Sequence, residues 1–387
     1  MIIQNKQRLS ISLFFFISGI CFATWTSRIP TIKIMFALNE AELGTLLLAL
    51  PIGSLIGLPI SGWLVSRYDS RVPLGIAFFI SCVCLAFIGF SQSVLAVAVA
   101  LCLFAFTMKI FSVSVNTQAI ALQKQYDKKI LGVMHGLWSG GGIIGILIST
   151  LMVYLNISYR FHLLSVAVIT ALITLLLYNH LLRNDRSPSG NKLILGRPDP
   201  YIFYLGVLVF LAAVCEGGMF DWSGIYFQEV LKIKVFTYGF LIFMICMTMA
   251  RFMSDYVIKR IGMSATYIIS ALCIITGIGL TVFFPIAWIA MAGFSLVGIG
   301  TAAIVPISYS LAGFSNKYSP GMAISIIATY AITGMLVGPP MIGYLAHTFN
   351  LQISFILFAI CGVMIIPVSQ LLLKHQRSLA AAEEEHA

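Results

Sequence analysis

The chain has 387 residues, of which 60% are hydrophobic and only 9% are charged, and its mean hydropathy is +1.00. A water-soluble protein of this length needs many more charged residues to cover its surface, so the composition excludes that class and predicts an all-α, polytopic membrane protein. The net charge of +10 falls mostly between apolar runs. It therefore indicates membrane topology, and we expect no nucleic-acid partner.

Twelve apolar runs are long enough to cross a bilayer, which takes about 20 residues. Separated by charged or Pro/Gly-marked breaks, they are 10–33, 42–65, 72–92, 94–119, 131–155, 161–182, 201–230, 237–257, 264–284, 287–312, 320–344 and 351–373. The first run follows Lys6 and Arg8, as a signal sequence would. No small-residue cleavage site comes after it, so we expect a retained span.

The basic residues predict the orientation of these spans. With the N-terminus inside, the outside segments hold only Lys33, Arg160, Lys232 and Lys234. Three more of the 23 lie within or at the edges of spans, namely Arg28, Lys109 and Arg251. The other sixteen fall on the inside. This positive-inside asymmetry predicts a multi-pass protein of the bacterial cytoplasmic (inner) membrane, with both termini in the cytoplasm.

The longest polar stretch, residues 183–200 (RNDRSPSGNKLILGRPDP), follows the sixth span. It divides the chain into an N-terminal half (1–182) and a C-terminal half (201–387) joined by a cytoplasmic loop. The halves also echo each other: 66–68 (SRY) corresponds to 254–256 (SDY), and 24–26 (TWT) to 221–223 (DWS). These features predict two pseudo-symmetric six-helix halves with a solute site between them near the midplane.

In the first span, Cys21, Thr24, Trp25 and Arg28 follow the i, i+3, i+4, i+7 spacing and share one stripe of a helix. Arg28 suits a carboxylate- or phosphate-bearing solute, because guanidinium forms bidentate hydrogen bonds to such groups. Trp25 is a candidate contact for the same solute. The alternative is that Arg28 snorkels to the outer interface.

The fourth span places Lys109, Ser112 and Asn116 on one face. Lys109 is too deep to snorkel easily, so it either lines the solute cavity or pairs with Glu216. Asn116 and Gln118 lie about 200° apart around the helix, so only one of them can face the cavity. We expect Asn116 to be that residue.

On the fifth span, His135 and Trp138 share a face, and Gly136 and Gly140 form a predicted close-packing pair. His135 is a candidate proton-relay group because imidazole titrates near neutrality. Its alternative role is that of an interfacial residue with satisfied hydrogen bonds. Trp138 is a candidate solute contact.

The seventh span carries two acids, Glu216 and Asp221, in residues 214–228 (VCEGGMFDWSGIYFQ). An ionised acid at the bilayer centre is unfavourable by roughly 2.5–3.5 kcal/mol on insertion scales. Glu216 is therefore either a proton carrier or a structural acid paired with a base. Asp221 lies about 140° further around a straight helix, but a break at Gly217-Gly218 would let both acids reach one cavity. Trp222 is an interfacial anchor or a stacking wall for the solute.

Charges at the inner ends of the second and eighth spans are candidates for gating. Arg251 and Asp255 have the i, i+4 spacing of a salt bridge. They correspond in position to Arg67 and Arg71, which belong to the loop after the second span. We expect all four to stabilise a closed state of the inner gate.

Hydroxyl groups repeat at four-residue spacing along the eleventh span, at Ser325, Thr329 and Thr333. Such hydroxyls commonly bond one helix to another. Tyr330 stands beside them. The alternative is that Tyr330 and these hydroxyls contact a sugar-like solute.

Several segments resemble the major facilitator superfamily. Residues 62–71 (GWLVSRYDSR) are similar to the signature G-x-L-x-D-R-x-G-x-R, with Ser66 in place of its acid and Asp69 in place of its second glycine. Residues 135–145 (HGLWSGGGIIG) look like the family's glycine-rich fifth helix. Residues 25–30 (WTSRIP), 216–224 (EGGMFDWSG), 305–306 (VP) and 338–343 (GPPMIG) resemble a bacterial branch grouped with fucose permeases. The resemblance implies twelve helices and secondary transport by alternating access.

We therefore expect a proton-coupled transporter, not an enzyme, that carries a small polar solute of anionic or hydroxylated character. It should act as a monomer in membrane lipid, with protons and the solute as partners and with neither cofactor nor metal. No G-x-x-x-x-G-K-[ST] motif occurs, so ATP does not drive it directly. The alternative is a proton-driven exporter of drugs or metabolites, for which the 28 phenylalanines would form a tolerant aromatic cavity.

Overall fold

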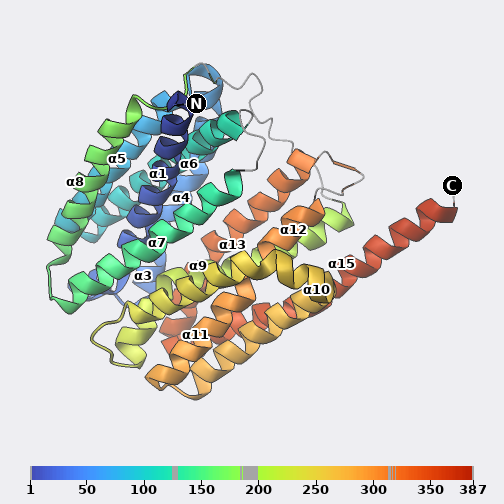
Figure 1. Cartoon of the computed structure of the whole chain (residues 1–387). Helices are drawn as coiled ribbons and strands as arrows, with labels where there is room; N and C mark the ends of the chain where they lie inside the picture. The colour runs from blue at the N-terminus through green and yellow to red at the C-terminus, as the bar shows by residue number, and fades with distance from the viewer. Residues whose placement is uncertain are drawn as a thin grey trace. The chain divides into compact units, whose positions relative to one another are not determined.

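The computed structural model of the chain describes residues 2–123, 130–183, 185, 199–312, 315, 317–318 and 320–385, and these contain helices but no strands (Figure 1). The helices of the N-terminal part are α1 (Ile2–Thr26), α2 (Ile29–Met35), α3 (Glu40–Leu47), α4 (Ala49–Arg67), α5 (Arg71–Phe90), α6 (Val94–Gln123), α7 (Leu131–Tyr154) and α8 (Tyr159–Tyr178). Those of the C-terminal part are α9 (Pro200–Ile225), the π-helical turn η1 (Tyr226–Val230), α10 (Tyr238–Phe283), α11 (Ala287–Ala302), α12 (Ile304–Ala312), α13 (Pro320–Thr348), α14 (Leu351–Ser354) and α15 (Ile356–Glu385).

The all-α membrane fold is confirmed. Within the described residues, eleven helical segments are long and apolar enough to cross a bilayer, and Tyr238–Ser254 is a shorter apolar helix at the place of the predicted eighth span. The predicted eighth and ninth spans are the two parts of α10. They meet at Gly262, whose φ of +82° and ψ of 165° are not helical. Glycine adopts this left-handed φ without the Cβ clash that other residues incur.

The chain divides into two units. Unit 1 comprises residues 1–38 and 45–194, and unit 2 comprises residues 39–44 and 195–387. Residues 39–44 join unit 2 because they contact α13 closely: a Cβ built on Gly343 would lie 2.6 Å from the Glu40 carbonyl oxygen and 2.9 Å from Gly44 Cα. Residues 184 and 186–198 of the expected cytoplasmic loop lie outside the described part of the chain.

In unit 1, glycines allow α1 and α7 to approach closely. A Cβ on Gly141 would lie 1.9 Å from the Phe16 carbonyl oxygen, and one on Gly19 would lie 2.1 Å from the Trp138 carbonyl oxygen. The sequence predicted Gly136 and Gly140 as the close-packing pair of this helix. Gly140 instead faces open space, with no heavy atom within 4 Å of its virtual Cβ. The close-packing face of α7 is therefore rotated from the predicted one.

In unit 2, α9 is the central helix. Its side chains are buried without interruption from Ala212 to Ile225. Glycines at 334 and 338 bring α13 against its backbone. At its end, Tyr226 and Phe227 pack with Phe294 and Phe355, at ring-centroid distances of 4.9 to 6.0 Å. These aromatic rings fill the core of unit 2, because each is fully buried.

Candidate transport and coupling residues

Helix α9 positions both intramembrane acids. It begins at a regular N-cap, where the Asp199 side chain accepts a hydrogen bond from the Ile202 amide at 3.1 Å and Pro200 occupies the first turn. The helix continues through Gly217-Gly218, so the break that would let both acids reach one cavity does not occur. Those glycines accommodate Met335 and the Phe358 ring. The irregular backbone lies further on, in the π-helical turn η1.

Glu216 forms an ion pair with Arg251 of α10. Arg251 Nη2 donates to Glu216 Oε1 at 2.8 Å, and the side chains are 27% and 7% exposed, respectively. The sequence expected Arg251 to pair with Asp255, whose side chain lies outside the described part of the structure. The observed partner comes from a neighbouring helix, 35 positions away. This contact joins α9 to α10.

Asp221 is buried, with 9% of its surface exposed. In the part of the chain that the structure describes, its carboxyl group has no hydrogen bond or ion pair. Because α9 is unbroken, Asp221 and Glu216 lie on different faces of the helix. Moving an ionised carboxylate out of water without a partner is strongly unfavourable, so the charged form of Asp221 is disfavoured at this position.

Trp222 has a structural contact. Its indole Nε1 donates to the Pro339 carbonyl oxygen at 2.9 Å, and the side chain is completely buried. Pro339 and Pro340 lie inside α13, where proline removes backbone donors and bends the helix. The indole therefore stabilises the segment of α13 that contains the two prolines. This position favours packing over direct stacking on a solute.

Two members of the predicted stripe contact α8 or the turn before it within unit 1: Cys21 lies on α1, whereas Arg28 lies after the end of α1, at the N-cap of α2. Arg28 Nε donates to His162 Nδ1 at 3.0 Å, and Arg28 Nη2 lies 3.5 Å from the Ile157 carbonyl oxygen. Further along the same stripe, Cys21 Sγ contacts Thr170 Oγ1 at 3.6 Å. Arg28 is 4% exposed, so it does not snorkel. It is a buried cation held by a histidine and by the turn between α7 and α8.

Trp25 is also buried, and its indole Nε1 has no hydrogen-bond partner within the described residues. His162 Nε2 is a second buried nitrogen of unit 1 without a partner there. Buried donors of this kind are uncommon in native proteins. They mark α1 and α8 as a polar part of the bundle.

Lys109 lies at the centre of α6 and is half-buried. Its Cβ is close to α4, since a Cβ added to Gly57 would approach it to 3.1 Å. Across the described ranges its ammonium group has no hydrogen bond or ion pair. Lys109 is therefore a cation in the middle of a span that has no polar partner among the described residues.

Asn116 and Gln118 behave differently. Asn116 Nδ2 donates to the Ser112 carbonyl oxygen of its own helix at 2.8 Å and is half-buried. Gln118 is fully buried, and its Nε2 donates to Ser70 Oγ at 2.7 Å and to Asp185 Oδ2 at 2.9 Å. That Asn116 faces a solute cavity stays a prediction. Gln118 belongs to a structural network at the end of α6.

Sequence reasoning missed this network. Asp185 accepts hydrogen bonds from both the backbone amide and the hydroxyl of Ser70, at the N-terminus of α5. A carboxylate there compensates the positive end of the helix dipole. The Ser66 hydroxyl, at the place of the signature's acid, donates instead to the Trp63 carbonyl oxygen of its own helix at 2.8 Å. The available signals were a glutamine inside an apolar run and an acid directly after the sixth span.

The other candidate side chains have aromatic contacts. His135 is exposed, with its ring 5.2 Å from that of Phe15, and Trp138 lies 5.7 Å from Phe22. Tyr330 is half-buried on α13, and its ring covers Gly206 of α9. None of these contacts supplies a polar partner for a proton.

The predicted gating arginines of unit 1 stack on aromatic rings. Arg67 lies 5.7 Å from the centre of the Trp63 ring, and Arg71 lies 5.8 Å from that of Tyr178. Neither pairs with an acid in the described part of the chain. Their role in gating stays a prediction.

Long apolar helices in two units define a polytopic membrane transporter. Inside the spans they carry an ion pair, and an acid and a lysine that have no partner among the described residues. The chain belongs to the Major Facilitator Superfamily, whose family model matches residues 11–317. The protein is thus a secondary transporter and not an enzyme.

Relatives span almost the whole chain. An uncharacterized MFS-type transporter of Yersinia pestis is 29% identical over 90% of this chain and 91% of its own length. The membrane protein MosC of Rhizobium meliloti is 28% identical over 95% of this chain and 90% of its own length. Among solved structures, the nucleoside transporter NupG matches with a TM-score of 0.78 at 14% identity, covering 95% of this chain and 99% of its own. A bacterial homolog of the human lysosomal transporter Spinster, inward-facing and occupied, matches with a TM-score of 0.77 at 14% identity. The match covers 95% of this chain and 96% of the homolog. These structural likenesses concern the fold.

Proposed function

We propose that the protein is a proton-coupled transporter of a small polar solute, anionic or hydroxylated, in the bacterial inner membrane. It works as a monomer with both termini in the cytoplasm, and it belongs to the branch that resembles fucose permeases. The observation that carries this proposal is the pair of buried acids on α9. Glu216 is ion-paired, whereas Asp221 has no partner within the described residues.

The Glu216–Arg251 pair supports a coupling role. A proton taken up by Glu216 removes the charge that holds Arg251 at 2.8 Å, so α9 and α10 lose their ionic contact. Release of the proton restores it. A switch of this kind links protonation to the relative movement of two helices, which is what coupling requires. Asp221 is the second candidate, because a proton removes the unfavourable charge of an unpaired buried carboxylate.

Lys109 supports an anionic solute. It is a half-buried cation at mid-span without a polar partner in the described structure, and a carboxylate or phosphate group would compensate its charge. Arg28 already donates to His162, which favours a supporting role. Asn116, Trp25, Trp138 and Tyr330 remain proposed solute contacts, and His135 a proposed proton relay.

The experiment begins with a thermal-shift screen of the purified protein against metabolites and antibiotics at pH 6 and pH 8. A ligand at one hundred times its Kd adds about 2.7 kcal/mol to apparent stability. Stabilisation by one anion or sugar with a pH-dependent shift supports the proposal. Weak shifts from many unrelated apolar compounds would instead favour the exporter.

The solute so identified is then followed in proteoliposomes with an imposed proton gradient. Glu216→Gln should abolish accumulation against a gradient while leaving solute exchange partly intact. Asp221→Asn tests the second acid in the same way, and Glu229→Gln, at the end of the same helical segment, is the matched control. If both acid variants still accumulate the solute as the control does, protons are not coupled through α9.

A further inference from the structure

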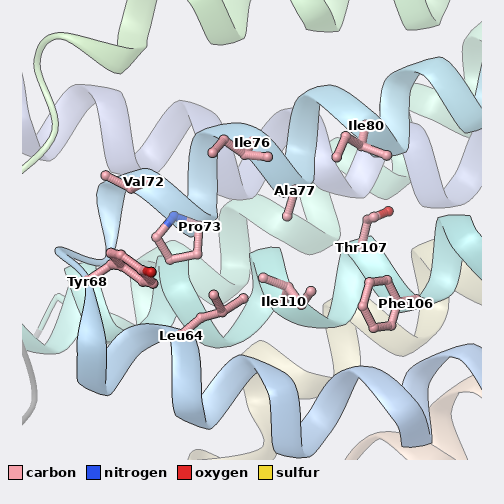
Figure 2. Close-up of a pocket in the computed structure, with 10 residues that line it drawn as sticks. All are labelled: Leu64, Tyr68, Val72, Pro73, Ile76, Ala77, Ile80, Phe106, Thr107 and Ile110. Carbon is pink, nitrogen blue, oxygen red and sulfur yellow. The ribbon is translucent and has the colours of Figure 1, made fainter.

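Two apolar grooves flank α5 in unit 1. The first, of about 350 Å³, lies between α4, α5 and α6 (Figure 2). The second, of about 280 Å³, lies between α5 and α8 and includes Leu175 and Tyr178. Ile76 and Ile80 line both grooves and are 58% and 42% exposed. The grooves are therefore two sides of one exposed apolar ridge.

The first groove suits a hydrocarbon chain. Figure 2 shows Tyr68, Val72 and Pro73 at one end and Phe106 and Thr107 at the other. The Thr107 hydroxyl is already bonded to its own helix, which leaves the Tyr68 hydroxyl as the polar group at the opposite end. From Val72 to Ile80 the helix rises about 12 Å, most of the roughly 15 Å that one leaflet of the hydrocarbon core occupies.

An arginine adjoins a lining residue of each groove, in space for the second groove and along the chain for the first. The Arg71 guanidinium lies 5.8 Å from the ring centre of Tyr178, which lines the second groove. Its Nε is buried without a hydrogen-bond partner in the described structure. Arg67 precedes Tyr68, which lines the first groove, and stacks on Trp63.

Among the described residues, no acid forms an ion pair with these arginines. Asp185 is bound to Ser70 and Gln118. Asp69 has a partner of its own, and within the described residues neither Arg67 nor Arg71 forms an ion pair. Within the described ranges, two guanidinium groups therefore have no acidic partner where the chain meets the predicted inner interface. Arginine at such a site binds phosphate by paired hydrogen bonds.

We propose that the N-terminal end of α5 binds one anionic phospholipid, with its phosphate on Arg71 and Arg67 and its two acyl chains in the grooves on either side of Ile76 and Ile80. The lipid fixes α5 against α4, α6 and α8. The basic inner surface attracts anionic lipids in general. The grooves make this position a specific site.

The test is native mass spectrometry of the full chain in detergent, titrated with phosphatidylglycerol, phosphatidylethanolamine or phosphatidylcholine of equal chain length. We expect the first bound phosphatidylglycerol to bind at least about fivefold more tightly than either zwitterionic lipid. Arg71→Gln should weaken it about fivefold, and the double variant with Arg67→Gln about twentyfold. Arg260→Gln is the matched control, since Arg260 is exposed and bonded to the Tyr256 hydroxyl on α10.

A second variant tests the grooves. Ala77 lines the first groove and is 4% exposed, so Ala77→Leu should fill it and weaken phosphatidylglycerol several-fold with both arginines intact. The proposal is overturned if the three lipids bind equally, if Arg71→Gln has no more effect than Arg260→Gln, or if Ala77→Leu has none. Displacement of the lipid by an equal concentration of glycerol 3-phosphate would also overturn it, because the site would then recognise phosphate without the chains.

Discussion

The buried ion pair between Glu216 and Arg251 gives an asymmetric prediction for stability. Replacing Arg251 by Gln leaves the Glu216 carboxylate, whose side chain is only 7% exposed. Replacing Glu216 by Gln leaves the Arg251 guanidinium, which is 27% exposed and can extend its charge toward water. The first change should therefore be the more harmful one.

The magnitudes follow from the geometry. Two unit charges about 4 Å apart attract by about 4 kcal/mol at an effective dielectric constant near 20, and removing one partner of a buried pair typically costs about 3–5 kcal/mol. We expect Arg251→Gln to lower the free energy of unfolding by about 3 kcal/mol and Glu216→Gln by about 1.5 kcal/mol, discounted for the exposure of Arg251. The double variant should lose about 2 kcal/mol, because no charge is left unpaired.

The assay is denaturant unfolding of the purified variants in one detergent, with Arg260→Gln on the same helix as the control. The control should change stability by less than about 0.5 kcal/mol. Equal losses for the two single variants would refute the argument from exposure. Losses that simply add in the double variant would show that the two side chains do not interact.

Two further predictions concern packing. Gly141→Ala should destabilise the protein by about 2 kcal/mol or more, because the new Cβ would lie 1.9 Å from a backbone carbonyl oxygen of α1. Gly140→Ala is the control and should leave stability unchanged, because its Cβ would meet open space. Equal unfolding midpoints for the two variants would contradict this packing. Trp222→Phe should lose about 1 kcal/mol, since the Pro339 carbonyl oxygen loses its indole donor at 2.9 Å. Trp288→Phe, at a side chain that is 78% exposed, is its control in the same unfolding assay, and an equal effect of both would show that the indole bond is not stabilising.

The sequence alone was enough to predict the class of protein and most of the spans. Runs of about 20 apolar residues have few stable alternatives to a membrane helix, because a bilayer offers no water to the backbone. The non-helical residue Gly262 falls between two predicted spans, because an irregular backbone inside the bilayer would leave its polar groups without hydrogen bonds. The motifs at 62–71 and 135–145 were sufficient for the superfamily, since they are continuous stretches of sequence.

Partners of side chains depended on the tertiary structure. Arg251 bonds Glu216 on another helix instead of the neighbour four positions along its own, and Arg28 turns to His162 on α8. Periodicity gives the angle between side chains on one helix, but it does not give the rotation of that helix in its bundle. That rotation is set by packing between helices. At the α1–α7 contact, for example, Gly141 packs against α1, whereas the predicted Gly140 faces open space. The sequence thus determined which charges lie within the membrane, and the packing of the helices decided which of them are paired.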